Sequence, residues 1–121
     1  MEDKLQVNNK EELQAIIDAY PTRLRRGLVA ITTNTVDVED EETFEKGKTL
    51  LSEQYIVAVG DLVKDLQPGD KVDVNVDAMF TVKRYANNSD ETFVEFNAKT
   101  KEVNGYELAI VDERIIEQIY K

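Results

Sequence analysis

The chain has 121 residues, 41% of them apolar, and carries 25 acidic against 15 basic side chains, for a net charge of −10. A chain of this length and apolar content forms about one domain with a single core. Cysteine, histidine and tryptophan are absent, which excludes disulfides, thiolate or histidine metal sites and the catalytic pairs that need histidine. We therefore expect no metal, no cofactor and no enzymatic activity.

The charge and the hydropathy pattern also restrict the partners. A strongly negative chain repels the phosphates of nucleic acids and of anionic lipids. No apolar run approaches the roughly 20 residues of a membrane span, and residues 1–10 lack the apolar stretch of a secretory signal. We expect a soluble protein of the cytoplasm with neither a nucleic acid nor a membrane as its partner.

Residues 9–20 have the pattern of a short amphipathic helix. Asn9 is a favourable N-cap residue, Glu12 is placed for a capping box, and Pro21 ends the pattern. The apolar face is formed by Leu13, Ile16, Ile17 and Tyr20. A helix of about three turns is marginal alone, so this face must dock on the rest of the domain or on a neighbour. We interpret residues 1–22 as a helical arm that contacts a partner through Leu13, Ile16 and Ile17.

From residue 24 onward the pattern is that of short β-strands. Residues 24–32 and 49–63 predict two strands, and the connection 33–48 holds six carboxylates from Asp37 to Glu45, too many like charges for a core. Further strands are indicated in residues 71–77, 80–86, 93–99, 101–111 and 115–121. Six or seven short antiparallel strands with regular turns predict a mainly β chain that folds as a small barrel or sandwich.

Turn residues and alternation fix two parts of this pattern. Pro68-Gly69 predicts a tight turn in which Asp70 bonds back to the turn amides, and Asn104-Gly105 suits a type I′ hairpin. The strand after the first turn alternates apolar and polar residues, as a half-buried strand does. We expect one core to collect Val57, Val59, Val72, Val74, Val76, Leu108 and Ile110.

The outward face of residues 71–77 begins like a calcium-binding loop. Asp73, Asn75 and Asp77 occupy the first three ligand positions of such a loop. Ala78 and Arg84 stand where the loop needs glycine and a bidentate glutamate. The polar residues are better explained as the solvent face of a strand, and no metal is expected.

The densest basic cluster in this acidic chain is formed by Arg23, Arg25 and Arg26. Two interpretations stay open. The cluster is a solvated strand edge, or it meets the acidic run 37–45 of an adjacent copy. Complementary patches of this kind favour head-to-tail contacts between copies.

Three separated segments of the chain carry a family resemblance through their order and spacing. They are residues 55–60 (YIVAVG), 66–75 (LQPGDKVDVN) and 106–120 (YELAIVDERIIEQIY). In this order they resemble the co-chaperonin family GroES, and residues 26–32 (RGLVAIT) are similar to that family's first strand. The resemblance covers about residues 23–121. It implies a small GroES-like β-barrel domain that assembles into a ring, with a mobile loop that grips a chaperonin. The loop would be residues 33–48, and the gripping residues Leu50 and Leu51 with Phe44.

Two functions remain. The one we favour is a structural subunit of a large assembly, an auxiliary protein of a phage capsid, because it accounts for the added helix, the acidic surface and the missing catalytic groups. The alternative is a working co-chaperonin. Either function makes the partners protein subunits and the chain a homo-oligomer, in the host cytoplasm or the virion. The candidate partner-binding residues are Leu13, Ile16, Ile17, Arg23, Arg25, Arg26, Phe44, Leu50 and Leu51.

Overall fold

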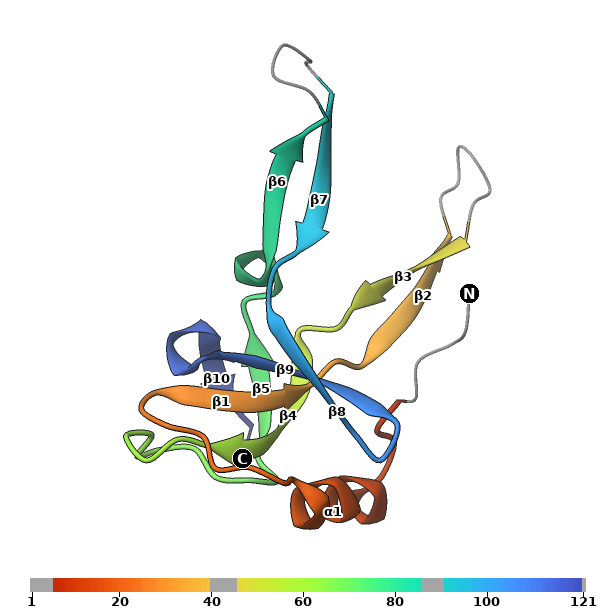
Figure 1. The fold of residues 1–121 in the computed structure, drawn as a ribbon. Helices are drawn as coiled ribbons and strands as arrows, with labels where there is room; N and C mark the ends of the chain where they lie inside the picture. The colour runs from red at the N-terminus through yellow and green to blue at the C-terminus, as the bar shows by residue number, and fades with distance from the viewer. Residues whose placement is uncertain (1–5, 40–45, 86–90, 121) are drawn as a thin grey trace.

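The computed structural model describes residues 6–39, 46–85 and 91–120. These residues form one α-helix, two 3-10 helices and ten strands (Figure 1). The helices are α1 (Lys10–Ala19), η1 (Val76–Met79) and η2 (Glu113–Ile115). The strands are β1 (Leu28–Thr32), β2 (Thr35–Glu39), β3 (Lys46–Leu50), β4 (Glu53–Val59), β5 (Lys71–Val74), β6 (Phe80–Arg84), β7 (Thr92–Phe96), β8 (Lys99–Val103), β9 (Tyr106–Asp112) and β10 (Ile116–Ile119).

Six of the strands form one antiparallel sheet, in the order β10-β5-β4-β1-β9-β8. The other four form two ladders, β2–β3 and β6–β7, which project from the sheet as hairpins (Figure 1). The prediction of a mainly β chain is confirmed. The described strands number ten instead of six or seven, and their sheet is not a closed barrel, because β10 and β8 are its edges.

The segment between β1 and β4 contributes the two strands that the sequence pattern did not predict. Residues 33–48 were expected to form a loop because of their acidic run, yet Thr35–Glu39 and Lys46–Leu50 pair as the ladder β2–β3. The register makes Asp37 the Cα partner of Lys48 and Glu39 that of Lys46. Residues of opposite charge are favourable cross-strand partners.

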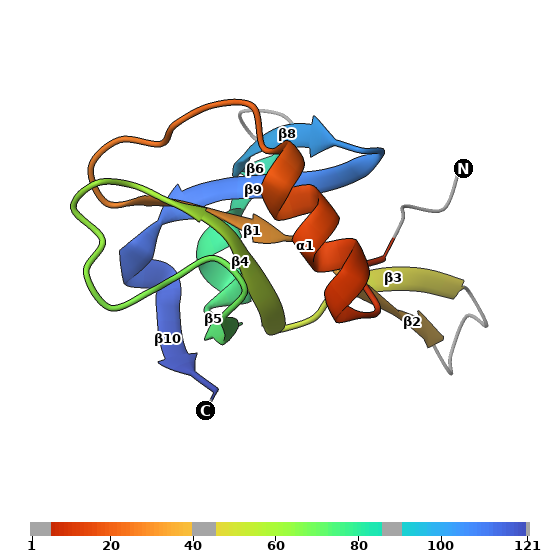
Figure 2. The same cartoon turned by 90° about the horizontal axis from the view of Figure 1, so that it is seen from below.

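The sheet is buried on both faces. The loop-side cluster packs the connection between β4 and β5, η1 and the ends of β6 and β7 on one face. Its buried residues are Val29, Ile31, Ile56, Val63, Leu66, Val72, Val74, Met79, Ala109 and Val111. The helix-side cluster lies on the other face, which α1 crosses (Figure 2). Its buried residues are Val7, Leu13, Ile16, Ala30, Val57, Val103 and Leu108.

The expectation of one core is therefore wrong. Val72 and Val74 belong to the loop-side cluster, whereas Val57 and Leu108 belong to the helix-side cluster. The cause is the alternation of side chains along a strand, which sends neighbouring residues to opposite faces. A sheet covered on both faces buries both sets.

A β-bulge interrupts the regular alternation of side chains where β1 pairs with β4. Ala30 is the Cα partner of Ala58, and Ile31 is the partner of Ile56, so Val57 is the extra residue on β4. Val57 and Ala58 both contact the helix-side cluster, as Ala30 does. A bulge bends the strand and increases its twist, and here it lets two successive residues of β4 contact the same cluster.

The helix α1 begins and ends as the sequence predicts. The Asn9 side chain accepts from the Glu12 N–H at 2.8 Å, and the Glu12 carboxylate accepts from the Asn8 N–H at 2.9 Å. The apolar face docks on the sheet of the same chain: Leu13 is 5% exposed and Ile16 is fully buried. The prediction that these two residues contact a partner needs correction, because the helix-side cluster already covers them.

Both predicted turns are confirmed. Gly69 has a φ of 97°, and the Asp70 carboxylate accepts from the Gln67 N–H at 2.9 Å. Asn104 and Gly105 have φ values of 54° and 83°, as a type I′ turn requires. They join β8 to β9 directly. The Asn104-Gly105 turn therefore fixes the register of β8 and β9, whereas the Gly69 turn is tied to β4 by the Gly69 N–H, which donates to the Ile56 carbonyl at 2.7 Å.

Candidate protein interface

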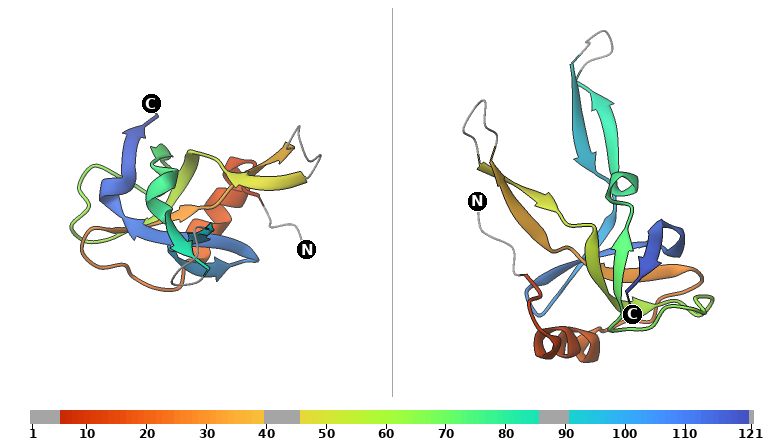
Figure 3. Two further views of the ribbon diagram at one scale, coloured as in Figure 1. Left: turned by 90° about the horizontal axis from the view of Figure 1, so that it is seen from above. Right: turned by 180° about the vertical axis from the view of Figure 1, so that it is seen from behind.

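The hairpin β6–β7 extends away from the sheet, as the right-hand view of Figure 3 shows. At its base Phe80 and Phe96 are Cα partners, and their ring centroids lie 5.4 Å apart in an edge-on contact. Both rings pack against the loop-side cluster. Two residues farther out on each strand, Val82 and Val94 are Cα partners and are 67% and 63% exposed. The apolar ladder thus continues beyond the core into solvent.

The opposite face of the same hairpin is also partly apolar. Tyr85 and Phe93 stack with their ring centroids 4.8 Å apart, and Tyr85 is 68% exposed. Lys83 and Glu95 form an ion pair beside them. This face combines an aromatic pair with a charge pair of zero net charge.

Val82, Tyr85 and Val94 are the most exposed large apolar side chains of the described residues. A two-stranded ladder of this size is marginally stable on its own, and fully burying a valine stabilises by about 1.5 kcal/mol or more. Exposed apolar groups that gather on one element are typical of protein contact sites. The hairpin therefore has the composition of a docking element.

The second hairpin, β2–β3, is anchored by a buried polar junction at its base. Gln54 is 1% exposed, and its Oε1 accepts from the Thr32 hydroxyl and from the Asn34 N–H, both at 2.8 Å. Its Nε2 donates to the carbonyls of Asn34 at 2.9 Å and Leu51 at 2.8 Å. Both polar atoms of the amide are satisfied, so the junction holds the start and the end of the hairpin together.

The same junction also binds the N-terminal segment. The Asn34 Oδ1 accepts from the Val7 N–H at 2.8 Å, and the Asn34 Nδ2 donates to the Val7 carbonyl at 3.0 Å. The chain before α1 is thereby hydrogen-bonded to the base of the hairpin, in addition to the apolar contacts of Val7.

Two of the three apolar residues predicted to grip a partner, Leu50 and Leu51, lie near this junction. Leu50 ends β3, is partly buried and packs against the loop-side cluster. Leu51 follows it and is 38% exposed, with its N–H bonded to the Asn34 carbonyl at 3.0 Å. Phe44 lies outside the described residues. Of this set, Leu51 alone combines a described position with an exposed side chain, and the structure does not bring it to the end of the hairpin.

The arginine cluster lies in the segment between α1 and β1. Arg23, Arg25 and Arg26 are all exposed. Asp61 accepts from the Arg26 N–H at 2.6 Å, and this bond, with the charges of Arg25 and Arg23 beside it, lowers the pKa of the Asp61 carboxyl. Ile17, the last of the predicted helix contacts, is partly buried against the helix-side cluster.

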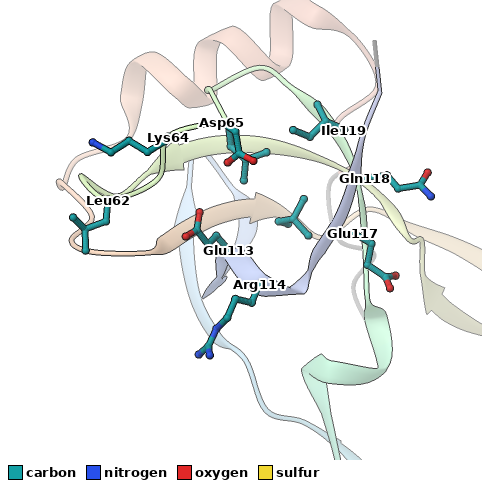
Figure 4. A pocket seen from close by; sticks show the side chains of 10 residues that line it. Leu62, Lys64, Asp65, Glu113, Arg114, Glu117, Gln118 and Ile119 are labelled. Carbon is teal, nitrogen blue, oxygen red and sulfur yellow. The ribbon is translucent and has the colours of Figure 1, made fainter.

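A shallow groove adjoins this segment. It lies between the connection that follows β4 and the C-terminal elements η2 and β10 (Figure 4). Its lining carries both signs of charge, with Lys64 and Arg114 against Asp65, Glu113 and Glu117. The Arg114 guanidinium is held by Asp112 through bonds of 3.0 and 3.2 Å, which lower the pKa of the Asp112 carboxyl. The lining therefore has three acidic side chains against two basic ones, a mixture that does not select a strongly charged small molecule.

The described residues offer neither a metal site nor a membrane-spanning helix. Within residues 6–39, 46–85 and 91–120, no group of three acidic, histidine or cysteine side chains could hold a metal ion. The helix found in these ranges is too short and too polar to cross a membrane.

Comparison of the chain with family models, with curated proteins and with solved structures finds no match in any of the three. The likeness to the GroES family therefore stays a prediction. The candidate interface on β6–β7 is supported by the geometry of this chain alone.

Sequence reasoning missed the outer residues of β6–β7. The segment TFVEF places Phe93, Val94 and Phe96 on both faces of one strand, where a half-buried strand would alternate cleanly. That departure from alternation is the signal that could have identified them. A two-stranded ladder that projects from the sheet cannot bury apolar side chains on both of its faces within the same chain.

Proposed function

We propose that this chain is a non-enzymatic subunit of a larger protein assembly and that it contacts its protein partner through the hairpin β6–β7. The observation that carries the proposal is the exposed Val82 and Val94 pair, with Tyr85 on the other face. The finer form of the proposal is an auxiliary protein of a phage capsid. It is supported by the acidic composition and by the absence of histidine and cysteine from the sequence.

The partner that suits this hairpin is an apolar groove on another protein. The base of the hairpin is fixed by Phe80 and Phe96, so ordering it on binding costs less conformational entropy than ordering a free loop. The aromatic face adds an anchor of the kind enriched at interface centres. The neutral charge pair at Lys83 and Glu95 leaves the contact to be decided by apolar burial.

The test uses the double variant Val82→Thr/Val94→Thr, in which threonine replaces both exposed valines. Threonine keeps the β-branched shape that suits a strand, so we expect circular dichroism and melting to stay close to wild type. Incorporation of the tagged chain into particles of its native source, measured by co-sedimentation with megadalton material, should fall by about tenfold or more.

A matched control is Val36→Thr, the same replacement at a 43% exposed position on β2. It should leave incorporation unchanged. Full incorporation of the double variant, or a wild-type chain that sediments alone in every extract, would contradict the proposal. Nuclease-resistant DNA in the same particles would support the capsid form.

A co-chaperonin is the second candidate, and one observation favours it. The hairpin β2–β3 leaves the sheet between β1 and β4, where the resemblance to GroES implies the partner-binding loop. The testing variant is Leu51→Ala, because Leu51 is exposed whereas Leu50 packs against the loop-side cluster. This function requires an ATP-dependent complex between the wild type and a chaperonin, measured by gel filtration, that the variant weakens without losing stability.

A further inference from the structure

The turn between β8 and β9 contains a residue pair that is chemically labile. Asn104 and Gly105 are its two central residues, and both are exposed. Asparagine is one of the thermolabile residues of proteins. Its side-chain amide is most easily attacked by the backbone nitrogen of a following glycine, because glycine has no side chain to obstruct the approach. The pair that suits a type I′ turn is therefore also open to a covalent change.

The contacts of this turn leave both reacting groups accessible. The Asn104 Nδ2 donates to the Ala15 carbonyl of α1 at 3.4 Å, which is longer than a typical N–H···O bond. Within the described residues, no group donates to the Asn104 Oδ1, and the Gly105 N–H forms no hydrogen bond. The attack therefore requires the loss of a single long hydrogen bond and a local rotation of the turn.

The other asparagines of the described ranges lack this combination, because each is followed by a residue that carries a side chain. They are Asn8, Asn9, Asn34, Asn75 and Asn97. Asn34 is the clearest contrast. Its Oδ1 and Nδ2 are both hydrogen-bonded to the backbone of Val7, and the N–H of the following Thr35 donates to the Gln6 side chain at 2.6 Å. Asn34 is thus the internal reference for a protected amide.

We propose that Asn104 is a site of spontaneous deamidation, a modification that goes beyond the proposed function and does not depend on it. The Gly105 nitrogen bonds to the Asn104 Cγ, and the side-chain nitrogen leaves as ammonia with the proton that the Gly105 nitrogen gives up. The product is a cyclic succinimide. Water then opens the ring at either carbonyl. Opening at the former side-chain carbonyl leaves aspartate, and opening at the backbone carbonyl leaves isoaspartate, whose main chain runs through the former side chain.

Either product weakens the link between this turn and α1. The amide that donates to the Ala15 carbonyl is lost, and a carboxylate takes its place beside that carbonyl. Isoaspartate also lengthens the backbone by a methylene, and a two-residue turn sets the register of its strands. Val103 directly precedes the turn, pairs with Tyr106 and is buried in the helix-side cluster. The isoaspartate form therefore loosens the edge strand β8 from the cluster that holds α1.

The test is prolonged incubation of the purified, folded full chain at mildly alkaline pH, which favours loss of the Gly105 N–H proton. Peptide mapping by mass spectrometry should show that Asn104 loses its amide while Asn34 keeps it. A fraction with a lower melting temperature should grow in step with the isoaspartate content. The matched control is Asn104→Gly, because a Gly-Gly pair suits the same turn and has no amide to lose. This variant should keep its melting temperature throughout the incubation.

The variant Asn104→Asp separates the new charge from the longer backbone. Because an Asp-Gly pair also suits a type I′ turn, this variant should melt between the wild type and the isoaspartate fraction. An Asn104 amide that survives as long as that of Asn34 would overturn the proposal. Loss of the amide only after the chain has been denatured would overturn it as well. An isoaspartate fraction that melts like the wild type would show that β8 is not loosened.

Discussion

Gln54 shows how one buried polar side chain can hold two parts of the fold together. Its amide joins Thr32, Asn34 and Leu51 by four hydrogen bonds. We expect Gln54→Met, which keeps the length and removes the bonds, to lower the free energy of unfolding by about 2 to 5 kcal/mol, because buried backbone groups lose their partners. Denaturant unfolding measures this loss. The control Gln118→Met, at an exposed position of β10, should change stability by less than about 0.5 kcal/mol.

Asp61 provides a pH-dependent contribution to stability. Its pKa is lowered in the folded protein by the Arg26 N–H and the nearby arginines. A carboxyl with a lowered folded pKa stabilises above its unfolded pKa, near 4, and loses that contribution as the pH falls through the folded value. Asp61→Asn should therefore melt below the wild type at pH 7, and the difference should vanish under acid conditions. A difference that persists unchanged at about pH 2 would contradict this assignment.

The sequence predicted those features that depend on a few neighbouring residues. The Asn9 cap, the Asp70 turn and the Asn104-Gly105 turn are all confirmed, because each depends on a few neighbouring residues. Gln54 was not predicted, since its partners come from β1 and from the start of the hairpin. A polar residue within an apolar run gives no sign of what it will meet across the sheet.

At the scale of elements, α1 packs on one face of the sheet and contributes to its core. Ile16 is fully buried, so Ile16→Ala should lower the free energy of unfolding by about 2 to 5 kcal/mol in a denaturant titration. The control Gln14→Ala removes an exposed bond to Asp18 and should cost no more than about 0.5 kcal/mol. An Ile16→Ala variant as stable as the wild type would show that the helix is not held by this contact.

The helix also marks a limit of sequence reasoning. Its apolar face predicts docking, and the face is docked, but amphipathicity does not say whether the cover comes from the same chain or from another. The hairpin β2–β3 marks a second limit. Its acidic run argued for a loop, whereas the cross-strand partners Lys46 and Lys48 lie beyond the run and enter only when the two strands pair.

At the scale of the whole molecule, the sequence predicted the class of fold and not its closure. Alternation along each strand identified mainly β structure, because that signal is local. Closure into a barrel depends on whether the edge strands β8 and β10 meet, which no local pattern encodes, and here they remain the edges of the described sheet. The second cluster was missed for a similar reason, since strands β1, β4 and β9 supply residues to both faces.

The two clusters should unfold together, because strands β1, β4 and β9 supply residues to both. Ile31 lies in the loop-side cluster and Leu108 in the helix-side cluster, both fully buried on paired strands β1 and β9. Ile31→Ala and Leu108→Ala should each cost about 2 to 5 kcal/mol. In both variants, two spectroscopic signals should change at the same denaturant concentration. One is the far-ultraviolet circular dichroism of the sheet, and the other is tyrosine fluorescence, which reports on Tyr20, Tyr55 and Tyr106 on the helix side. Earlier loss of the tyrosine signal in Leu108→Ala would show that the helix side unfolds alone and that the sheet does not couple its two faces.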